Sequence, residues 1–226
     1  MHQCQGKHWF ERMIKKGADP FERQLHYDVG TQVHSALEFA VNYLNRERPA
    51  MGMSTEILER LLVGANAAAD TRLTLPLAKA QRQYVRDTIR EVGSYLINDE
   101  MEDVTLMPER VVQSKSVIAG KHVGGILDLG VLYTDKKSKE KVFRILDYKN
   151  QLERMEAGRF TPEYLAKFPT TKEALQSVIY PFSVLDSDSP LLDQVNRVET
   201  FFAVNEGNHL SMIKSGSLER DSVKAV

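Results

Sequence analysis

The feature that most constrains the fold is a change of pattern in the middle of the chain. Between residues 104 and 148, segments rich in branched apolar residues alternate with short turn-forming or charged stretches, which is typical of successive strands. Strands are predicted at Val104–Val112, Ser116–Ala119, Val123–Tyr133 and Val142–Tyr148. A meander of strands therefore occupies the middle of the sequence.

Helical spacing lies on both sides of these strands. Apolar residues recur every three or four positions in segments predicted as helices at Val29–Leu44, Ser54–Ala69, Leu75–Ile97 and Thr171–Leu185. Ser54 and Thr171 are candidate N-caps, and Pro76 falls in the first turn of the third helix. With a last core strand at Val198–Val204, this order predicts an α/β (mixed α+β) fold, a central mixed β-sheet flanked by helices.

The length of the chain suits one domain. At 226 residues and 42% apolar content, the sequence has enough material for one sizeable core. We expect a single domain over residues 1–226, with a helical part at about 29–97, a sheet at about 104–150, a helix at about 171–185 and last strands at about 196–214.

Composition excludes several classes of protein. Thirty basic and 31 acidic residues give a net charge of −1, so any surface for nucleic acid must be local. The single cysteine, Cys4, forms no internal disulfide and is too few for a four-cysteine cluster. No apolar run reaches the roughly 18 residues of a membrane span, and the N-terminal residues lack the apolar core of a signal peptide, so we expect no membrane association and a cytoplasmic location.

A charged loop defines an antiparallel hairpin. The segment 134–141 is polar and lies between two apolar runs. If the loop is symmetric, Tyr133 pairs with Val142, and the same register places Asp128 directly opposite Asp147. Directly opposed side chains have Cβ atoms about 4.5–5.5 Å apart, and like charges there destabilise a sheet. These two carboxylates therefore require compensation.

A divalent cation would supply that compensation. Both aspartates interrupt apolar strands, where an unpaired carboxylate is costly to bury. Mg²⁺ and similar hard ions bind one or two carboxylates together with water and substrate phosphate. Lys149 projects from the same strand face as Asp147, where an ammonium could orient a water or stabilise charge on a phosphate. The hairpin thus indicates metal-assisted phosphodiester hydrolysis.

Structural roles for the same residues stay open. Asp147 and Lys149 could form an ion pair on an edge strand. Asp128 could lie at a bulge beside Gly124, Gly125 and Gly130. The hairpin alone does not decide between these roles and a metal site.

Four separated elements resemble a known superfamily. They are Gly30-x-x-x-His34 at the start of a helix, Gly125-x-x-Asp128, Asp147-Tyr148-Lys149, and Gln176-x-x-x-Tyr180 on a later helix. In this order they resemble the RecB-like branch of the PD-(D/E)XK nucleases, which have a restriction-endonuclease-like core. The resemblance spans Gly30 to Tyr180, about two-thirds of the chain. The proline of the superfamily's name is replaced by Leu127.

The resemblance implies a set of site residues. His34, Asp128, Asp147 and the backbone carbonyl of Tyr148 would bind Mg²⁺ or Mn²⁺, and Lys149 would be the catalytic lysine beside Asp128 and Asp147. Some relatives carry four cysteines for an iron–sulfur cluster; no such cluster is expected here.

The same resemblance assigns DNA contacts to Gln176 and Tyr180. These two residues, one helical turn apart, would position the DNA strand, although they could instead be a surface pair.

Several other residues have open roles. Glu38, one turn beyond His34, could orient the histidine or be solvated, and Glu109 could approach the metal although nothing in its spacing requires it. Basic side chains at Lys79, Arg82, Arg86 and Arg90 and a group of loop lysines could follow a phosphate backbone or be solvated. Aromatic residues for stacking on an unpaired strand are Trp9, Phe10, Phe160 and Tyr164.

These observations favour a DNA nuclease. The leading hypothesis is a Mg²⁺- or Mn²⁺-dependent deoxyribonuclease, an exonuclease of recombination, repair or phage DNA metabolism in a bacterial or phage-infected cell. One competing hypothesis is a catalytically silent DNA-binding or assembly module of the same fold. Another is the nuclease part of a helicase-nuclease, because the chain contains no phosphate-binding loop of its own and would need a helicase partner.

Overall fold

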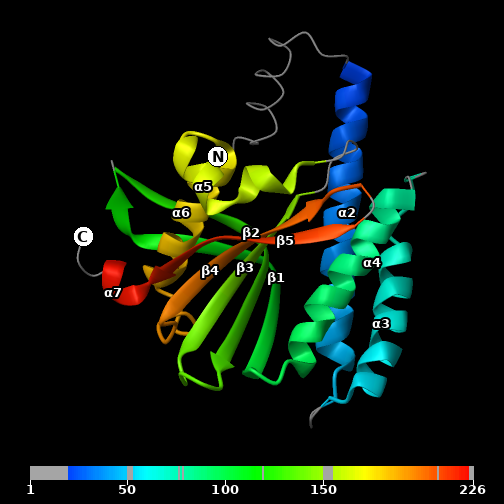
Figure 1. Cartoon of the computed structure of the whole chain (residues 1–226), viewed down its shortest axis with the longest axis horizontal. Helices are drawn as coiled ribbons and strands as arrows, with labels where there is room; N and C mark the ends of the chain where they lie inside the picture. Colours follow the sequence, from blue (N-terminus) through cyan, green and yellow to red (C-terminus); the bar gives the residue numbers. More distant parts are fainter. Residues whose placement is uncertain are drawn as a thin grey trace.

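The computed structural model of the chain describes residues 20–49, 53–75, 77, 79–118, 120–149, 155–207 and 209–223. Its helices are α2 (Pro20–Glu47), α3 (Thr55–Asp70), α4 (Lys79–Ser94), α5 (Pro162–Lys167), α6 (Lys172–Leu185) and α7 (Arg220–Val223), with short 3₁₀ turns η1 (Tyr95–Ile97) and η2 (Ala157–Phe160). The strands are β1 (Met101–Ile118), β2 (Lys121–Asp135), β3 (Lys141–Lys149), β4 (Arg197–Asn205) and β5 (Leu210–Glu219). Figure 1 shows α2, α3 and α4 together as one layer beside the sheet, whereas α5 and α6 lie apart from this layer.

The five strands form one mixed sheet in the order β1-β2-β3-β4-β5. Neighbours are antiparallel except β3 and β4, which are parallel and therefore need a crossover, supplied by the segment that contains α5 and α6. The predicted hairpin register is confirmed, since Tyr133 pairs with Val142 and Leu132 with Phe143. The predicted fold class, a mixed sheet flanked by helices, is also confirmed.

Helix α2 packs along the edge strand β1. The predicted apolar stripe is buried to 1% exposure or less at Val33, Leu37, Ala40, Val41 and Leu44. Burying each of the valine and leucine side chains contributes about 1.5–3 kcal/mol. Near the end of the helix, Asn45 donates to the carbonyl of Leu106 (3.0 Å) and Arg48 to that of Val104 (2.7 Å). These bonds fix the position of α2 along β1.

The face of the sheet opposite α2, α3 and α4 is covered by α6. Thr171 accepts from the N–H of Ala174 (3.3 Å), so the predicted N-cap is confirmed. Val184 and Leu185 share a core cluster with Phe143 and Ile145 of β3. The predicted cap at Ser54 is likewise present at the start of α3.

The β1–β2 hairpin extends beyond the other strands and is held by the end of α6. Ser183 donates to the carbonyl of Val123 (3.1 Å). The backbone carbonyl and the carboxylate of Asp186 accept from the N–H groups of Lys115 (2.7 Å) and Ser116 (2.8 Å). This extension is the wall of the site described below.

Some predicted boundaries were wrong. The segments Val104–Val112 and Ser116–Ala119 belong to one continuous strand, because a register shift between Gln113 and Val117 absorbs the polar interruption; Ala119 itself lies outside the described residues. The third helix begins at Lys79, not at Leu75, and Pro76 also lies outside the described residues.

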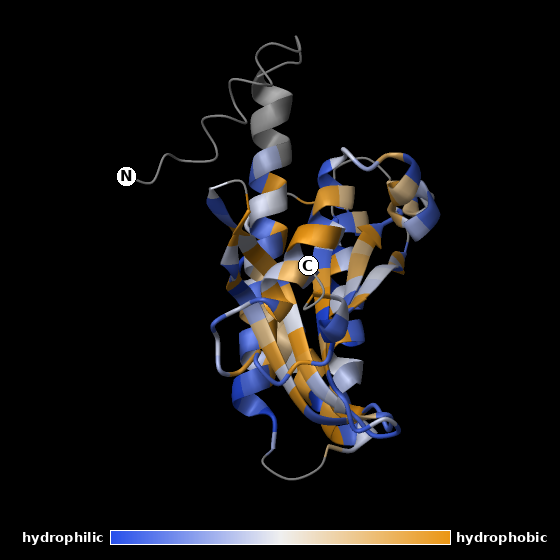
Figure 2. Ribbon diagram, turned by 90° about the vertical axis from the view of Figure 1, so that its left-hand side faces the viewer, coloured by the Kyte–Doolittle hydropathy of each residue, from blue (hydrophilic) through white to orange (hydrophobic). Residues whose placement is uncertain are grey.

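Apolar residues concentrate on the strands and on the helix faces packed against them, as the hydropathy colours of Figure 2 show. Among the described helices, none combines the length and apolar character needed to cross a bilayer.

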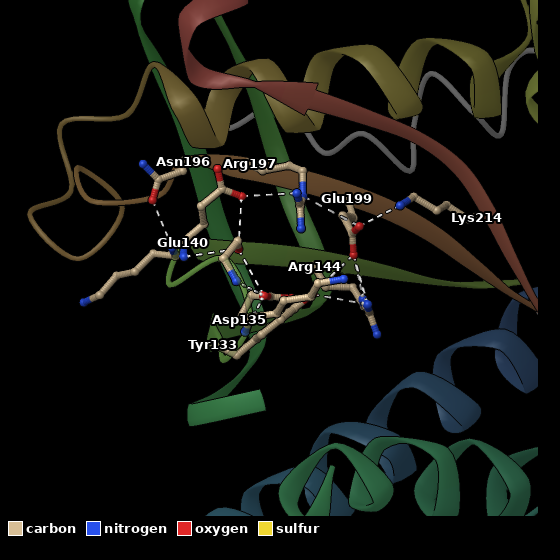
Figure 3. Close-up of polar contacts among 11 residues, drawn as sticks. Tyr133, Asp135, Glu140, Arg144, Asn196, Arg197, Glu199 and Lys214 are labelled. Atoms are coloured by element: carbon tan, nitrogen blue, oxygen red, sulfur yellow. Dashed lines mark hydrogen bonds and ion pairs between the residues drawn. The ribbon is translucent and has the colours of Figure 1, made fainter. Parts of the chain in front are cut away.

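An ionic cluster joins β3, β4 and β5 (Figure 3). Glu199 accepts from Arg144 (2.9 Å) and from Lys214 (2.6 Å), and its side chain is only 8% exposed. The guanidinium of Arg144 lies over the ring of Phe201 at 4.6 Å. This cluster ties together the first residues of the parallel strand pair.

Candidate active site

The candidate site lies where β2 separates from β3. The last backbone pair between these strands is Leu129 with Leu146, and Asp128 and Asp147 are the next residues on each strand. Asp128 lies outside the ladder, and its Oδ2 accepts from the backbone N–H of Tyr148 at 2.7 Å. The Asp128 carboxylate therefore accepts a backbone hydrogen bond from β3 at the point where β2 and β3 separate.

Asp147 and Lys149 form a buried ion pair. The Lys149 Nζ lies 2.7 Å from Asp147 Oδ1, and the two side chains are 10% and 8% exposed. Burial raises the pKa of Asp147 and the charge of Asp128 adds to this rise, against the opposing effect of Lys149. Burial lowers the pKa of Lys149, but the charge and hydrogen bond of Asp147 outweigh it, so the pKa of Lys149 is raised. Lys149 is therefore an ammonium at neutral pH.

A hydrogen-bond chain continues from Lys149 into α6. Lys149 donates to Oε1 of Gln176 (3.1 Å), and the amide of Gln176 donates to the hydroxyl of Tyr180 (3.1 Å). Gly125 on β2 leaves room for this chain, because an added Cβ would lie 2.8 Å from the Tyr180 ring. The two residues predicted to contact DNA therefore also hold the lysine.

His34 reaches the same place from α2. Its Nδ1 lies 3.3 Å from Oδ1 of Asp128, and its ring meets the Tyr148 ring edge-on at 5.7 Å. Burial lowers the pKa of His34, but the hydrogen bond and charge of Asp128 outweigh this effect and raise it. For Gly30, at the start of this motif, no atom of the described residues lies within 4 Å of an added Cβ, so close packing within that part of the chain does not explain the glycine.

All seven predicted site residues line one pocket of about 390 Å³: His34, Asp128, Asp147, Tyr148, Lys149, Gln176 and Tyr180. Ile126, Met155, Lys172 and Glu173 complete its wall and were not predicted. For Lys172 and Glu173 a signal existed, because they precede Gln176 by one turn of the same helix.

The donor set around Asp128 fits a hard divalent cation. A ligand nitrogen of His34 and carboxylate oxygens of Glu109 and Asp128 all lie within 4.8 Å of one another. Carboxylates and an imidazole suit Mg²⁺ and Mn²⁺ among other ions. Asp147 is not in this close group and points its carboxylate to Lys149. Glu109, left open by the sequence, is thus brought to the site, while no hydrogen bond joins Glu38 to His34 in the described part of the chain.

The candidate DNA surface on α4 is partly engaged in other contacts. On α4, Arg82 and Arg86 lie 3.9 and 3.7 Å from Asp70. Arg90 lies 3.7 Å from Glu59. Three of the four basic side chains of this stripe therefore lie near acidic residues of α3.

The aromatic candidates are also accounted for in part. Phe160 is 3% exposed and packs on Phe202, and Tyr164 packs on Phe168 with ring centroids 4.7 Å apart. Trp9 and Phe10, like Cys4, lie outside the described residues.

Comparison with known proteins gives one family. A sequence model described as the PD-(D/E)XK nuclease superfamily matches residues 1–202, which include every site residue named above. No curated protein gives a significant match to the chain.

Proposed function

The chain belongs to the PD-(D/E)XK nuclease superfamily, and from this membership we propose that it is a divalent-metal-dependent deoxyribonuclease that hydrolyses phosphodiester bonds in DNA. The observation that carries the proposal is the meeting of Asp128, Asp147 and Lys149 with His34 in one pocket. Three segments far apart in the sequence supply these side chains, from α2, β2 and β3.

We assign the metal to the acidic side of the pocket. Asp128, Asp147 and His34, with the backbone carbonyl of Tyr148, would hold Mg²⁺ or Mn²⁺. When bound, such an ion lowers the pKa of a coordinated water and neutralises charge on phosphoryl oxygens. The close approach of His34 and Asp128, at 3.3 Å, supports this assignment.

Lys149 is placed to act on the phosphate. An ammonium has three hydrogens, and those of Lys149 bond to Asp147 and Gln176, which leaves one for a phosphate oxygen or the attacking water. In hydrolysis the water oxygen bonds to phosphorus, the bond to the leaving sugar oxygen breaks, and that oxygen takes up a proton. Because the pKa of Lys149 is raised, its role is to donate a hydrogen bond to the developing negative charge rather than to remove a proton.

The finer assignments rest on the resemblance of the four motifs. We propose the RecB-like branch, exonuclease activity, a role in recombination, repair or phage DNA metabolism, a cytoplasmic location, and work beside a helicase. Gln176 and Tyr180 are proposed to position the DNA strand in addition to positioning Lys149, because both residues line the pocket.

The test uses purified full-length protein with end-labelled linear DNA and covalently closed circular DNA, in Mn²⁺, in Mg²⁺ and in EDTA. We expect metal-dependent loss of linear DNA and little cutting of closed circles. Asp128→Ala and Lys149→Ala should each lower the rate by about 10²–10³-fold. Arg60→Ala, on a side chain that is 79% exposed on α3 and lies outside the pocket, is the control and should cut as the wild type does.

Each outcome has a distinct meaning. Rapid cutting of closed circles would replace exonuclease by endonuclease. No cutting of any DNA would overturn the nuclease assignment and favour a silent module of the same fold.

A further inference from the structure

Glu109 on β1 faces Asp128 across the sheet. Pro108 pairs with Leu129 and Arg110 with Leu127, so continuing the register places Glu109 opposite Asp128. These two acidic residues are not themselves paired, although the register is the same on both sides of them. Apart from the register shifts nearer its two ends, the strand pair is therefore interrupted where these two carboxylates lie.

The side-chain alternation of both strands shifts at this interruption. In β1, Met107 and Val112 belong to the same core cluster although their separation is an odd number of residues. In β2, Leu127 and Leu132 show the same behaviour. Strict alternation would place the members of each pair on opposite faces. On each strand, the positions that face a given side of the sheet therefore change between odd and even numbers at the interruption. The ordinary alternation of side chains does not fix the direction of Glu109 here.

The backbone of Glu109 is held in a strained conformation. Its φ is +48°, in the left-handed region. For a residue with a Cβ this costs about 1–2 kcal/mol. Conformations with such a cost persist where the surrounding structure enforces them, and they cluster at functional sites. The bonds of Arg110 and Pro108 to β2 on either side enforce it here.

The result is a carboxylate aimed at the candidate metal site. Its ligand oxygen lies within 4.8 Å of ligand atoms of both His34 and Asp128. In the described residues, the Glu109 carboxylate has no hydrogen-bond or ion-pair partner, whereas Asp147 is engaged by Lys149 at 2.7 Å. Of the acidic side chains at the site, Glu109 is thus the one with free oxygens beside His34.

We propose that Glu109 is a direct ligand of the divalent metal, together with His34 and Asp128. The proposal rests on the proposed nuclease function and adds to it a ligand from β1. With Asp147 and the backbone carbonyl of Tyr148 from the proposed function, the donors would number five, which leaves coordination positions for water and phosphate.

The test measures metal binding without DNA. Metal-free full-length protein is titrated with MnCl₂ by calorimetry, and bound Mn²⁺ is counted by electron paramagnetic resonance. We expect Glu109→Gln to raise the Kd for Mn²⁺ at least about tenfold, and Asp128→Asn to do so as well. Glu38→Gln is the matched control, because Glu38 contributes charge near Glu109 from α2 but lies outside the ligand group; its Kd should stay within about twofold of wild type.

A second variant separates folding from binding. Glu109→Gly removes the carboxylate and also relieves the positive φ. It should therefore be at least as resistant to heat in EDTA as the wild type, yet bind Mn²⁺ as weakly as Glu109→Gln.

The outcomes distinguish this proposal from the function on which it rests. Wild-type affinity in Glu109→Gln, with binding lost in Asp128→Asn, would remove Glu109 from the ligand set and leave the nuclease assignment intact. Equal weakening in Glu109→Gln and Glu38→Gln would reduce Glu109 to a source of charge. A wild-type protein that neither binds Mn²⁺ nor cuts DNA would overturn the function itself.

Discussion

Gln176 has a contact that motif resemblance alone did not supply. Its amide oxygen accepts from the buried ammonium of Lys149, and its amide nitrogen donates to Tyr180. A hydrogen bond to a charged group contributes about 1.5–3 kcal/mol. At the scale of single residues, Gln176 therefore determines where the ammonium lies.

Replacing Gln176 by Leu should lower kcat about ten- to a hundredfold, because the lost bond to Lys149 is worth about 1.5–3 kcal/mol and each 1.4 kcal/mol is tenfold in rate. Steady-state cleavage of end-labelled DNA measures this. The control is Gln194→Leu, since Gln194 accepts from Lys141 at 2.7 Å in an exposed pair outside the pocket. Equal kcat for both variants would contradict a positioning role for Gln176.

Part of the site could be predicted from the sequence, because the register of one hairpin was enough to place two of its carboxylates. A symmetric loop fixed the register that brings Asp128 and Asp147 to the same level of β2 and β3, as the structure shows. Glu109 was left open because nothing in its spacing requires it to approach the metal, and the strands change phase at this residue. A positive φ at a glutamate has no local sequence signal.

At the scale of elements, Gly125 fits β2 against α6. The strand approaches the helix so closely that a methyl group at this position would lie 2.8 Å from the Tyr180 ring. The glycine of the Gly125-x-x-Asp128 motif therefore has a packing reason that is separate from the aspartate's role.

Gly125→Ala should displace the Tyr180 ring and break its bond to Gln176, lowering DNA cleavage about ten- to a hundredfold through misplacement of the pocket wall. The same cleavage assay reports this, and circular dichroism checks that the fold is kept. In Gly158→Ala the added methyl meets no atom within 4 Å among the residues that the structure describes, so this variant is the control. Unchanged activity in Gly125→Ala would show that Tyr180 is not needed where it lies.

The ionic cluster makes a pH-dependent contribution to the β3–β4–β5 unit. Burial alone would raise the pKa of Glu199, but hydrogen bonds from Lys214 and Arg144 outweigh it and lower the pKa below its ordinary value of 4.5. A carboxylate with a lowered pKa stabilises the fold above that ordinary value, and this stabilisation is lost as the pH falls through the lowered pKa.

Glu199→Gln should therefore reduce the free energy of unfolding by about 3 kcal/mol at pH 7, since Arg144, Lys214 and Arg197 lose their buried partner, and the difference from wild type should shrink below pH 4.5. Urea unfolding across a pH series measures it. Glu56→Gln is the control, because its pair with Arg60 is 76% and 79% exposed and contributes little. A difference that grows on acidification would contradict the sign of the shift.

Elements with strong periodicity were predictable, and those without were not. Helix α2 shows its buried stripe in the sequence, and Ser54 and Thr171 marked two helix starts through caps that the structure contains. The end of β5 was missed beyond residue 214, because this edge strand has few buried positions to create an alternating pattern. The six-residue helix α5 is too short to display helical spacing.

At the scale of the whole molecule, bound metal should act on stability. Ligands at about one hundred times their Kd stabilise a native state by about 2.7 kcal/mol. For the wild type in Mn²⁺ we expect a rise in Tm of about 5–10 °C, at about 2–4 °C per kcal/mol for a chain of this size. Thermal scans with and without EDTA measure it. Asp188→Asn, on an exposed residue paired with Lys115, should keep the rise, whereas Asp128→Asn should lose it; a rise that persists in Asp128→Asn would place the metal elsewhere.

The overall arrangement depends on partners that no local pattern specifies. The sequence predicts a mixed sheet, but the pairing of β3 with β4 follows only once the helical crossover is placed on one face. The expectation of a single domain over residues 1–226 stays a prediction. Strand order is a long-range property, whereas periodicity reports only on neighbours.

The parallel pairing of β3 with β4 also has a consequence for protein synthesis. Val142 pairs with Arg197, which is synthesised 55 residues later. One edge of β3 therefore has no partner strand until β4 has been made. Contacts of such separation form late, because the intervening loop must close first. Asp147 and Lys149 are on β3, and Gln176 comes from within that loop. A chain still being translated would hold Gln176 apart from Asp147 and Lys149, so the complete pocket forms only after β4 has left the ribosome.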